Sequence, residues 1–189
     1  MYRKYFKRFL DIYLALVLLF ITFPLILVLM LIQLIIYGKH AFFIQERIGF
    51  REKRIKIVKF TTIKKDKRGE EYIPDISRFI RNVGMDELPQ LLLILKGDIS
   101  LIGPRPLLVE YLQLYSDYHK RRHEAKPGIT GLAQIKGRNN LPWKERFDLD
   151  VFYVDNISFF LDIKILFKTL IYIFTSKSDG SPAQKFEGY

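Results

Sequence analysis

The strongest constraint in this sequence is an uncharged apolar segment that a proline interrupts. No charged residue occurs from Ile12 to Gly38, and Pro24 stands in the middle of this run. About 20 consecutive apolar residues can cross the hydrocarbon core of a bilayer, so the run is predicted to be a membrane element. The basic residues before it are typical of a signal peptide, but the apolar part of a signal peptide is shorter and ends at a small-residue cleavage site, which is not found here. We therefore expect the segment to be retained.

Positive charge lies on both sides of this segment, whereas a spanning helix should carry most of its Lys and Arg on the cytoplasmic side. A re-entrant hairpin that enters from the cytoplasm, bends at Pro24 and returns to the same face removes this conflict. The hydroxyl of Thr22 is the nearest candidate to satisfy a backbone carbonyl that the proline frees. A spanning helix with a proline kink is the alternative. The basic residues are Arg3, Lys4, Lys7 and Arg8 before the segment, and Lys39, Arg47, Arg51, Lys53, Arg54, Lys56, Lys59, Lys64, Lys65, Lys67 and Arg68 after it.

The net charge of +11 indicates an acidic partner, which is a nucleic acid, an anionic membrane surface or a phosphorylated substrate. The membrane segment favours the last two and argues against nucleic acid. The absence of cysteine excludes disulfides and thiolate metal sites.

The rest of the chain is predicted to be mostly helical, with one small β-hairpin. Apolar and basic residues alternate over 41–64 around a turn at Gly49, which indicates extended structure. Helices are expected at 77–83, 86–97, 107–124 and 143–156, with a polar loop at 64–77 and a glycine-rich loop at 126–140. The segment 159–175 is predicted to be an amphipathic helix along a membrane surface.

The stretch "RNVGMDELPQL" (81–91) carries the most promising chemistry. Asp86 suits a helix N-cap with Pro89 in the first turn, and both Asp86 and Glu87 would favour the helix dipole without any further role. The other interpretation is catalytic. Adjacent helical residues point in different directions and can hold different roles, and a helix N-terminus attracts phosphate. A carboxylate that attacks phosphorus needs nearby cations or Mg²⁺.

Arginines at 78, 81 and 105 could supply that positive charge. Pro104 and Pro106 flank Arg105 and restrict its backbone, so this arginine loses little entropy on binding an anion, although a stiff surface turn would look the same. Tight turns at Gly128 and Gly131 could present backbone N–H groups to phosphate, or serve only as turns.

Together these stretches resemble one family, the bacterial sugar transferases, which are small monotopic phosphoglycosyl transferases. The resemblance runs from residue 5 to about 170. Within the family, the sequence is most similar to the type that transfers phospho-N,N′-diacetylbacillosamine to undecaprenyl phosphate. The matching stretches, in the order of the family, are "FKRFLDIYLALVLL", "FFIQERIG", "KFTTI", "DELPQLLLILKGDISLIGPRPLL", "KPGITGLAQIKGRN", "FDLDVFYV" and "LDIKIL".

The resemblance implies a monotopic protein on the cytoplasmic face of the bacterial inner membrane. Its parts would be a re-entrant helix-break-helix hairpin (1–40), a compact helical catalytic domain with interfacial amphipathic helices (41–176) and a flexible tail (177–189). It also implies transfer of a sugar 1-phosphate from a UDP-sugar to polyprenyl phosphate in the presence of Mg²⁺, as the first membrane step of glycoconjugate or polysaccharide assembly.

The resemblance also assigns the site residues. Asp86 would attack the β-phosphorus and form an aspartyl-phosphosugar intermediate, while Glu87 helps to hold Mg²⁺ or orients the acceptor. Substrate binding would fall to Lys59, Arg81, Pro104, Arg105 and Pro106, and the hairpin would bend at Pro24.

Two positions depart from the family pattern. Phe23 stands where a serine often precedes the proline, and Thr61 stands where a basic residue is expected, for which Lys64 or Lys65 is the candidate replacement. Two other functions remain open at this point. One is a non-catalytic membrane-anchored basic module that binds acidic lipid or nucleic acid, and the other is a membrane phosphatase in which water replaces the lipid acceptor.

Overall fold

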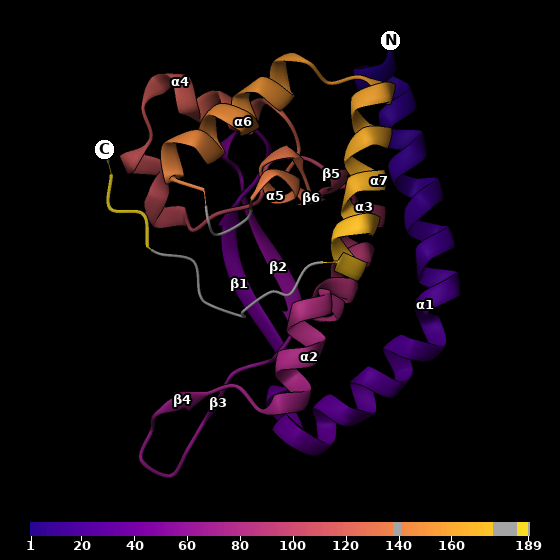
Figure 1. Cartoon of the computed structure of the whole chain (residues 1–189), viewed down its shortest axis with the longest axis vertical. Helices are drawn as coiled ribbons and strands as arrows, with labels where there is room; N and C mark the ends of the chain where they lie inside the picture. The colour runs from indigo at the N-terminus through magenta and orange to yellow at the C-terminus, as the bar shows by residue number, and fades with distance from the viewer. Residues whose placement is uncertain (138–140, 176–184, 189) are drawn as a thin grey trace.

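The apolar N-terminal segment forms one long helix, α1 (Lys7–Tyr37), after a π-helical turn at Tyr2–Phe6. The computed structural model describes residues 1–137, 141–175 and 185–188. Pro24 lies inside α1, and Figure 1 shows a bent helix whose first arm runs beside α7 while its second arm passes below α2. A proline inside a helix removes a hydrogen bond and kinks the axis. The predicted break is therefore a bend in a helix that continues through Pro24.

The hydrogen-bond partner predicted for the hydroxyl of Thr22 is wrong. The carbonyl that a proline at position 24 leaves without a donor is that of Phe20, four residues earlier. The hydroxyl of Thr22 instead donates to the carbonyl of Leu18 over 2.7 Å. This is the usual bond of a helical threonine to the turn before it, and bonds of this kind often bend helices. Thr22 therefore acts on the turn before the proline and does not replace the lost bond.

The first arm of α1 is fastened to the domain by polar contacts. Buried Asp11 accepts hydrogen bonds from the hydroxyl of Ser100 and the backbone N–H of Leu101. Lys7 pairs with buried Asp162 over 2.8 Å, and Arg8 donates to two carbonyls near the end of α3. These two members of the N-terminal basic cluster therefore face the protein.

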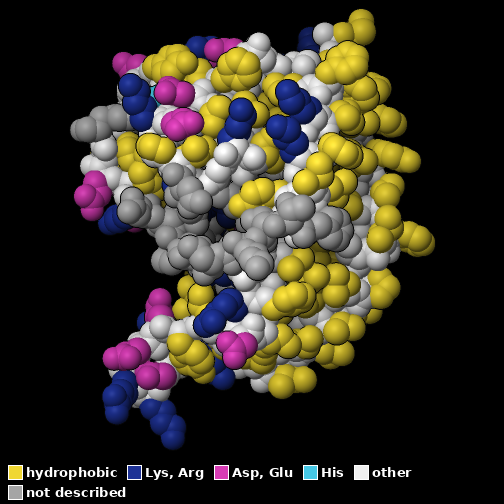
Figure 2. Space-filling model, viewed as in Figure 1, with side chains coloured by type: hydrophobic (Ala, Val, Ile, Leu, Met, Phe, Trp, Pro, Cys, Tyr) yellow, Lys and Arg dark blue, Asp and Glu magenta, His cyan; other side chains and the backbone are white. Residues whose placement is uncertain are grey.

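The outward faces of α1 and α7 are apolar. Phe20 of α1 and Phe160 of α7 are each 84% exposed, and Figure 2 shows hydrophobic side chains gathered along the side of the molecule where α1 lies. Among the described residues, the helical stretch Tyr2–His40 is long and apolar enough to cross a membrane. Soluble monomers rarely expose an apolar surface of this extent, so the two helices suit a lipid environment.

The predicted hairpin over 41–64 is confirmed. Strands β1 (Phe42–Ile48) and β2 (Arg54–Phe60) pair antiparallel, with Phe43 opposite Lys59. The turn begins at Gly49, where an added Cβ would lie 2.9 Å from the side chain of Ile55. The predicted polar loop contains a second short hairpin of β3 (Lys64–Lys65) and β4 (Glu71–Tyr72).

The remaining elements are short and mostly helical, as predicted. Figure 1 shows them packed around the β1–β2 hairpin, with α4, α5 and α6 on the side away from α1. The helices are α2 (Asp75–Val83), α3 (Leu91–Lys96), α4 (Asp117–Lys120), α5 (Leu132–Lys136), α6 (Trp143–Asp155) and α7 (Phe159–Thr175), with 3₁₀ turns at Gly38–His40, Phe50–Glu52, Met85–Gln90, Val109–Leu114 and Arg121–Glu124.

The glycine-rich segment 126–140 differs from the loop expected there. It contains strand β6 (Gly128–Thr130), which pairs in parallel with β5 (Ser100–Ile102), and then helix α5. A Cβ at Gly128 would lie 2.1 Å from the backbone nitrogen of Gly103. Gly128 thus permits close approach of two backbones. The end of the segment, 138–140, lies outside the described residues.

The main core joins α1 to α3, α7 and the β5–β6 pair. Ala15 of α1 packs with Ile94 of α3, Ile102 of β5 and Ile165 of α7. A second, aromatic cluster includes Phe186, whose side chain is buried. The predicted tail therefore contains a packed residue at 186, while 177–184 and 189 lie outside the described residues.

Candidate active site

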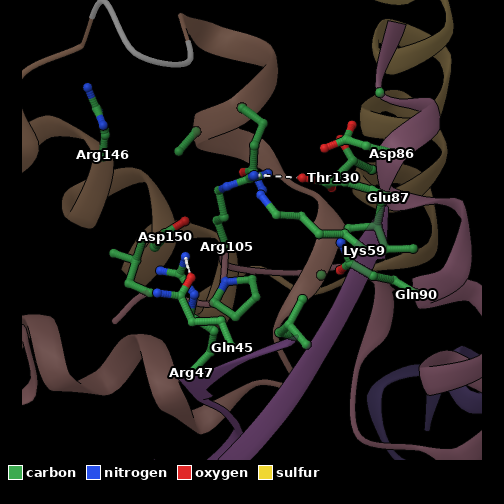
Figure 3. Close-up of a pocket in the computed structure, with 18 of the residues that line it drawn as sticks. Gln45, Arg47, Lys59, Asp86, Glu87, Gln90, Arg105, Thr130, Arg146 and Asp150 are labelled. Carbon is green, nitrogen blue, oxygen red and sulfur yellow. Dashed lines mark hydrogen bonds and ion pairs between the residues drawn. The ribbon is translucent and has the colours of Figure 1, made fainter. Parts of the chain in front are cut away.

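A cavity of about 490 Å³ opens between the β1–β2 hairpin, the 3₁₀ turn at Met85–Gln90, the loop around Arg105, and helices α5, α6 and α7. Its wall includes Asp86, Glu87, Lys59, Arg81 and Arg105. These residues come from segments far apart in the sequence, and Figure 3 shows several of them directed toward the same space.

Asp86 is held in the cavity wall by the turn that follows α2. Gly84 ends α2 in the left-handed conformation, with φ of 81°, and its backbone N–H donates to the carbonyls of Ile80 and Arg81. The chain then enters the 3₁₀ turn, so Gly84 precedes the first helical residue and the predicted N-cap role of Asp86 is wrong. No side chain caps this turn. Asp86 is only 4% exposed, so its position needs a reason other than capping.

The ionisation of Asp86 is strongly affected by its surroundings. Burial, and then the charge of Glu87, raise its pKa to about 6. Lys59, Arg105 and Arg81 act in the opposite direction. The carboxylate is therefore ionised at neutral pH, in a site where water contributes little to its stabilisation.

Glu87 forms an ion pair with Arg105. Its carboxylate accepts a hydrogen bond from Arg105 over 2.7 Å, drawn as a dashed line in Figure 3. This charge is the main reason why the pKa of Arg105 is raised. The two carboxylates, expected to point in different directions, both line the cavity and repel each other, so they share one site.

Lys59 and Arg81 complete the positive side of the cavity. Lys59 comes from β2, and its ammonium group lies 5.3 Å from the ring centre of Phe43 on the neighbouring strand. Burial lowers the pKa of Lys59, and the charges of Asp86 and Glu87 partly restore it. Arg81 comes from the last turn of α2. Neither side chain has a carboxylate within ion-pair distance among residues 1–137, 141–175 and 185–188.

Comparison with known proteins shows to which family the chain belongs. The family model described as bacterial sugar transferase matches residues 2–176. The chain belongs to the bacterial sugar transferase family. An uncharacterized sugar transferase of Bacillus subtilis, EpsL, is 45% identical to it over 96% of both chains.

Two further relatives have more specific names. The UDP-glucose:undecaprenyl-phosphate glucose-1-phosphate transferase of Klebsiella pneumoniae is 33% identical over 92% of this sugar transferase and 41% of its own length. The undecaprenyl-phosphate galactose phosphotransferase of Salmonella typhimurium is 46% identical over 54% of this chain and 21% of its own length. The chain thus spans less than half of these two longer proteins.

Some positions predicted for this sugar transferase do not reach the cavity. Pro106 lines it, but Pro104 does not, because the carbonyl of Pro104 accepts a hydrogen bond from the backbone of Gly128 in β6. Lys64 and Lys65 lie on β3, outside the cavity wall, and so do not replace a basic side chain at Thr61. The hydroxyl of Thr61 donates to the carbonyl of His40.

Several residues of the sugar transferase site escaped the sequence analysis. Arg122, which stands in a basic run, is buried and donates to the backbone carbonyl of Arg105 over 2.7 Å and to Asp150. Gln45 and Arg47 also line the cavity. The stretch "FFIQERIG" (42–49) contributed to the family resemblance, but its alternation indicated only a strand.

The donor set suits a magnesium ion that a substrate helps to bind. Among the described residues, no group of three or more His, Cys, Asp or Glu side chains could hold a metal. Mg²⁺ commonly uses one or two carboxylates together with substrate phosphates and water. Asp86 and Glu87 provide two carboxylates in one cavity, so these residues fit the ion.

Proposed function

We propose that this chain transfers a sugar 1-phosphate from a UDP-sugar to polyprenyl phosphate, in particular undecaprenyl phosphate. The names of the two longer relatives support this reaction class. The observation that carries it is Asp86, a buried carboxylate surrounded by Lys59, Arg81 and Arg105 in a cavity lined by several cations. A buried nucleophile among cations suits attack on a phosphoanhydride.

The proposed reaction has two halves. A carboxylate oxygen of Asp86 attacks the β-phosphorus of the UDP-sugar, and the bond from that phosphorus to the bridging oxygen breaks to release UMP. The phosphosugar stays on Asp86 until an oxygen of polyprenyl phosphate attacks the same phosphorus and frees the carboxylate. Lys59, Arg81 and Arg105 neutralise the phosphate oxygens in both halves, which lowers the repulsion between two anions.

Mg²⁺ held by Asp86 and Glu87, together with the substrate phosphates, would supply further charge neutralisation when bound. Glu87 also orients Arg105 through their ion pair. Sugar specificity depends on the shape of the pocket and not on the residues named so far.

The decisive experiment is UMP release from a panel of UDP-sugars by the full chain with polyprenyl phosphate and Mg²⁺. Release that depends on the lipid and yields a lipid-linked sugar phosphate supports the transferase and names the sugar. Sustained UMP release over many turnovers without a lipid-linked product would favour the phosphatase instead, because the transferase releases at most one UMP per protein molecule without lipid. A non-catalytic module that binds acidic lipid or nucleic acid would release no UMP from any donor.

The rate of the first half-reaction is expected to fall about tenfold per pH unit below a pH of about 6, because Asp86 must be ionised to attack. The burst of UMP release without lipid measures this step and avoids the titration of the acceptor phosphate. Glu87→Gln removes a charge that raises the pKa of Asp86, so the midpoint of its profile should move to lower pH. A burst rate that stays constant from pH 8 to pH 5 would contradict the role of Asp86.

We further propose that α1 enters and leaves the cytoplasmic leaflet of the inner membrane on the same side, with α7 along the surface and exposed basic residues such as Lys4 and Lys39 on anionic lipid. The bend in α1 and the outward apolar faces of α1 and α7 support this arrangement.

Labelling of single cysteines tests this topology, and the chain has no native cysteine to interfere. Lys4→Cys and Lys39→Cys, both exposed, are expected to react with an impermeant maleimide in inverted membrane vesicles and to be protected in intact spheroplasts. Labelling of the two ends from opposite sides would establish a spanning helix. Pro24→Leu, which restores the helical hydrogen bond, is expected to shift the pattern toward the spanning one.

A further inference from the structure

Arg47 places a further guanidinium group in the cavity wall. It lies on β1, and the backbone there pairs with the segment after Pro106: Arg47 bridges to Leu108, and the N–H of Ile48 donates to the carbonyl of Leu107 over 3.0 Å. Gln45, on the same face of the strand, accepts a hydrogen bond from Nη2 of Arg47 over 2.5 Å. Strand, loop and glutamine therefore hold this guanidinium against the cavity.

The protein does not neutralise the charge of Arg47. Arg105 has Glu87 and Arg122 has Asp150, but in the described part of the chain no carboxylate lies within ion-pair distance of Arg47. Burial, and then the neighbouring charge of Arg105, lower its pKa, yet an arginine stays protonated in proteins. A partly buried cation without a counter-ion is unfavourable, and an anion in the cavity relieves this cost.

Arg47 belongs to a different part of the cavity wall from the cations that act on Asp86. Lys59, Arg105 and Arg81 all influence the ionisation of Asp86, whereas Arg47 interacts with Arg105 and Glu87. Figure 3 shows the head group of Arg105 between Asp86 and the side chain of Arg47. Positive charge therefore continues from the nucleophile through Arg105 toward Arg47.

We propose that Arg47 binds the α-phosphate of the UDP-sugar and stabilises it as UMP leaves. This inference rests on the proposed function, which puts the β-phosphorus at Asp86. As an Asp86 oxygen bonds to that phosphorus, the bridging oxygen departs with the bonding electron pair, so the α-phosphate changes from one negative charge to two. In-line displacement sends this oxygen away from the nucleophile, toward Arg47. An interaction that strengthens as the bond breaks lowers the barrier.

Exchange of labelled UMP into the UDP-sugar, without polyprenyl phosphate, isolates the first half-reaction and its reversal. Arg47→Met is expected to slow this exchange by about 10²-fold, as removal of one preorganised donor does elsewhere, and to weaken inhibition by UMP. Transfer from the preformed intermediate to polyprenyl phosphate should stay near the wild-type rate, because UMP has left by then. Arg47→Lys, which keeps the charge, should recover part of the exchange.

Arg54→Met is the matched control. Arg54 is an exposed arginine on β2 that pairs with Glu46, and its replacement should leave both half-reactions unchanged.

Equal slowing of both halves by Arg47→Met, or unchanged inhibition by UMP, would overturn the role of Arg47. Exchange that is lost in Asp86→Asn but kept in Arg47→Met would refute this inference alone. Absence of exchange and of UMP binding in the wild type would refute the proposed function, and the inference with it.

Discussion

Asp86→Asn is expected to abolish UMP release and at the same time to stabilise the fold. Loss of a covalent nucleophile typically lowers the rate by on the order of 10⁴-fold or more, because the amide oxygen cannot form the intermediate. The variant should still bind the donor, since Lys59, Arg81 and Arg105 remain in place. Measuring both UMP release and donor binding shows whether catalysis is lost while binding is kept.

The expected gain in stability follows from the raised pKa of Asp86. Its value is about 6 in the folded protein against 3.8 for an unperturbed aspartate. Above pH 6 the carboxylate is ionised in both states, and its ionised form favours unfolding by about 3 kcal/mol. Asn carries no charge, so the variant should have the higher Tm at pH 7.5, and the difference should shrink as the pH falls from 6 toward 4.

Asp117→Asn provides the control for both effects. Asp117 is fully exposed at the start of α4 and pairs with Lys120, so neither UMP release nor the pH dependence of Tm should change. A lower Tm for Asp86→Asn would show that its loss of activity reflects damage to the fold. UMP release that survives in this variant would exclude Asp86 as the nucleophile.

The parts of the fold with a clear local pattern were predictable from the sequence. The alternation over 41–64 predicted the β1–β2 hairpin, and the amphipathic pattern of 159–175 predicted α7. Strands β5 and β6 have three residues each, too few to show a period, and their pairing depends on two glycine backbones that meet only in the folded chain. The glycine-rich stretch therefore looked like a loop.

The site was predictable to a similar degree. The residues alone left Asp86 and Glu87 open between helix capping and catalysis and offered Arg81 as a cation, and the family resemblance added Lys59. The structure brings all four together with Arg105. Burial was the property that local sequence could not supply: Arg122 stands in the run "HKRRHE" (119–124), which is typical of a solvated face, yet its side chain is 1% exposed.

Among the residues that hold the site in place, Arg122 is expected to give the largest loss of stability when its charge is removed. Its guanidinium donates to Asp150 through Nε and Nη2 at 3.0 and 2.7 Å, and its carbon lies 5.6 and 5.5 Å from the ring centres of Tyr115 and Phe147. Arg122→Leu leaves Asp150 charged and buried without a partner, which typically costs about 3–5 kcal/mol. For a chain of this size the Tm should fall by roughly 10 °C. Arg121→Leu, next in sequence, removes an exposed partner of Asp155 and should change the Tm little.

The double variant Arg122→Leu/Asp150→Leu separates stability from positioning. Without a lone buried charge, it should unfold at a higher temperature than Arg122→Leu alone, since a buried ion pair can be replaced by apolar groups at little cost. It still lacks the 2.7 Å hydrogen bond from Arg122 to the carbonyl of Arg105. The rigid loop that presents Arg105 therefore loses an anchor, and KM for the donor should stay raised although the fold has recovered. If KM recovers together with Tm, the bond to Arg105 serves stability alone.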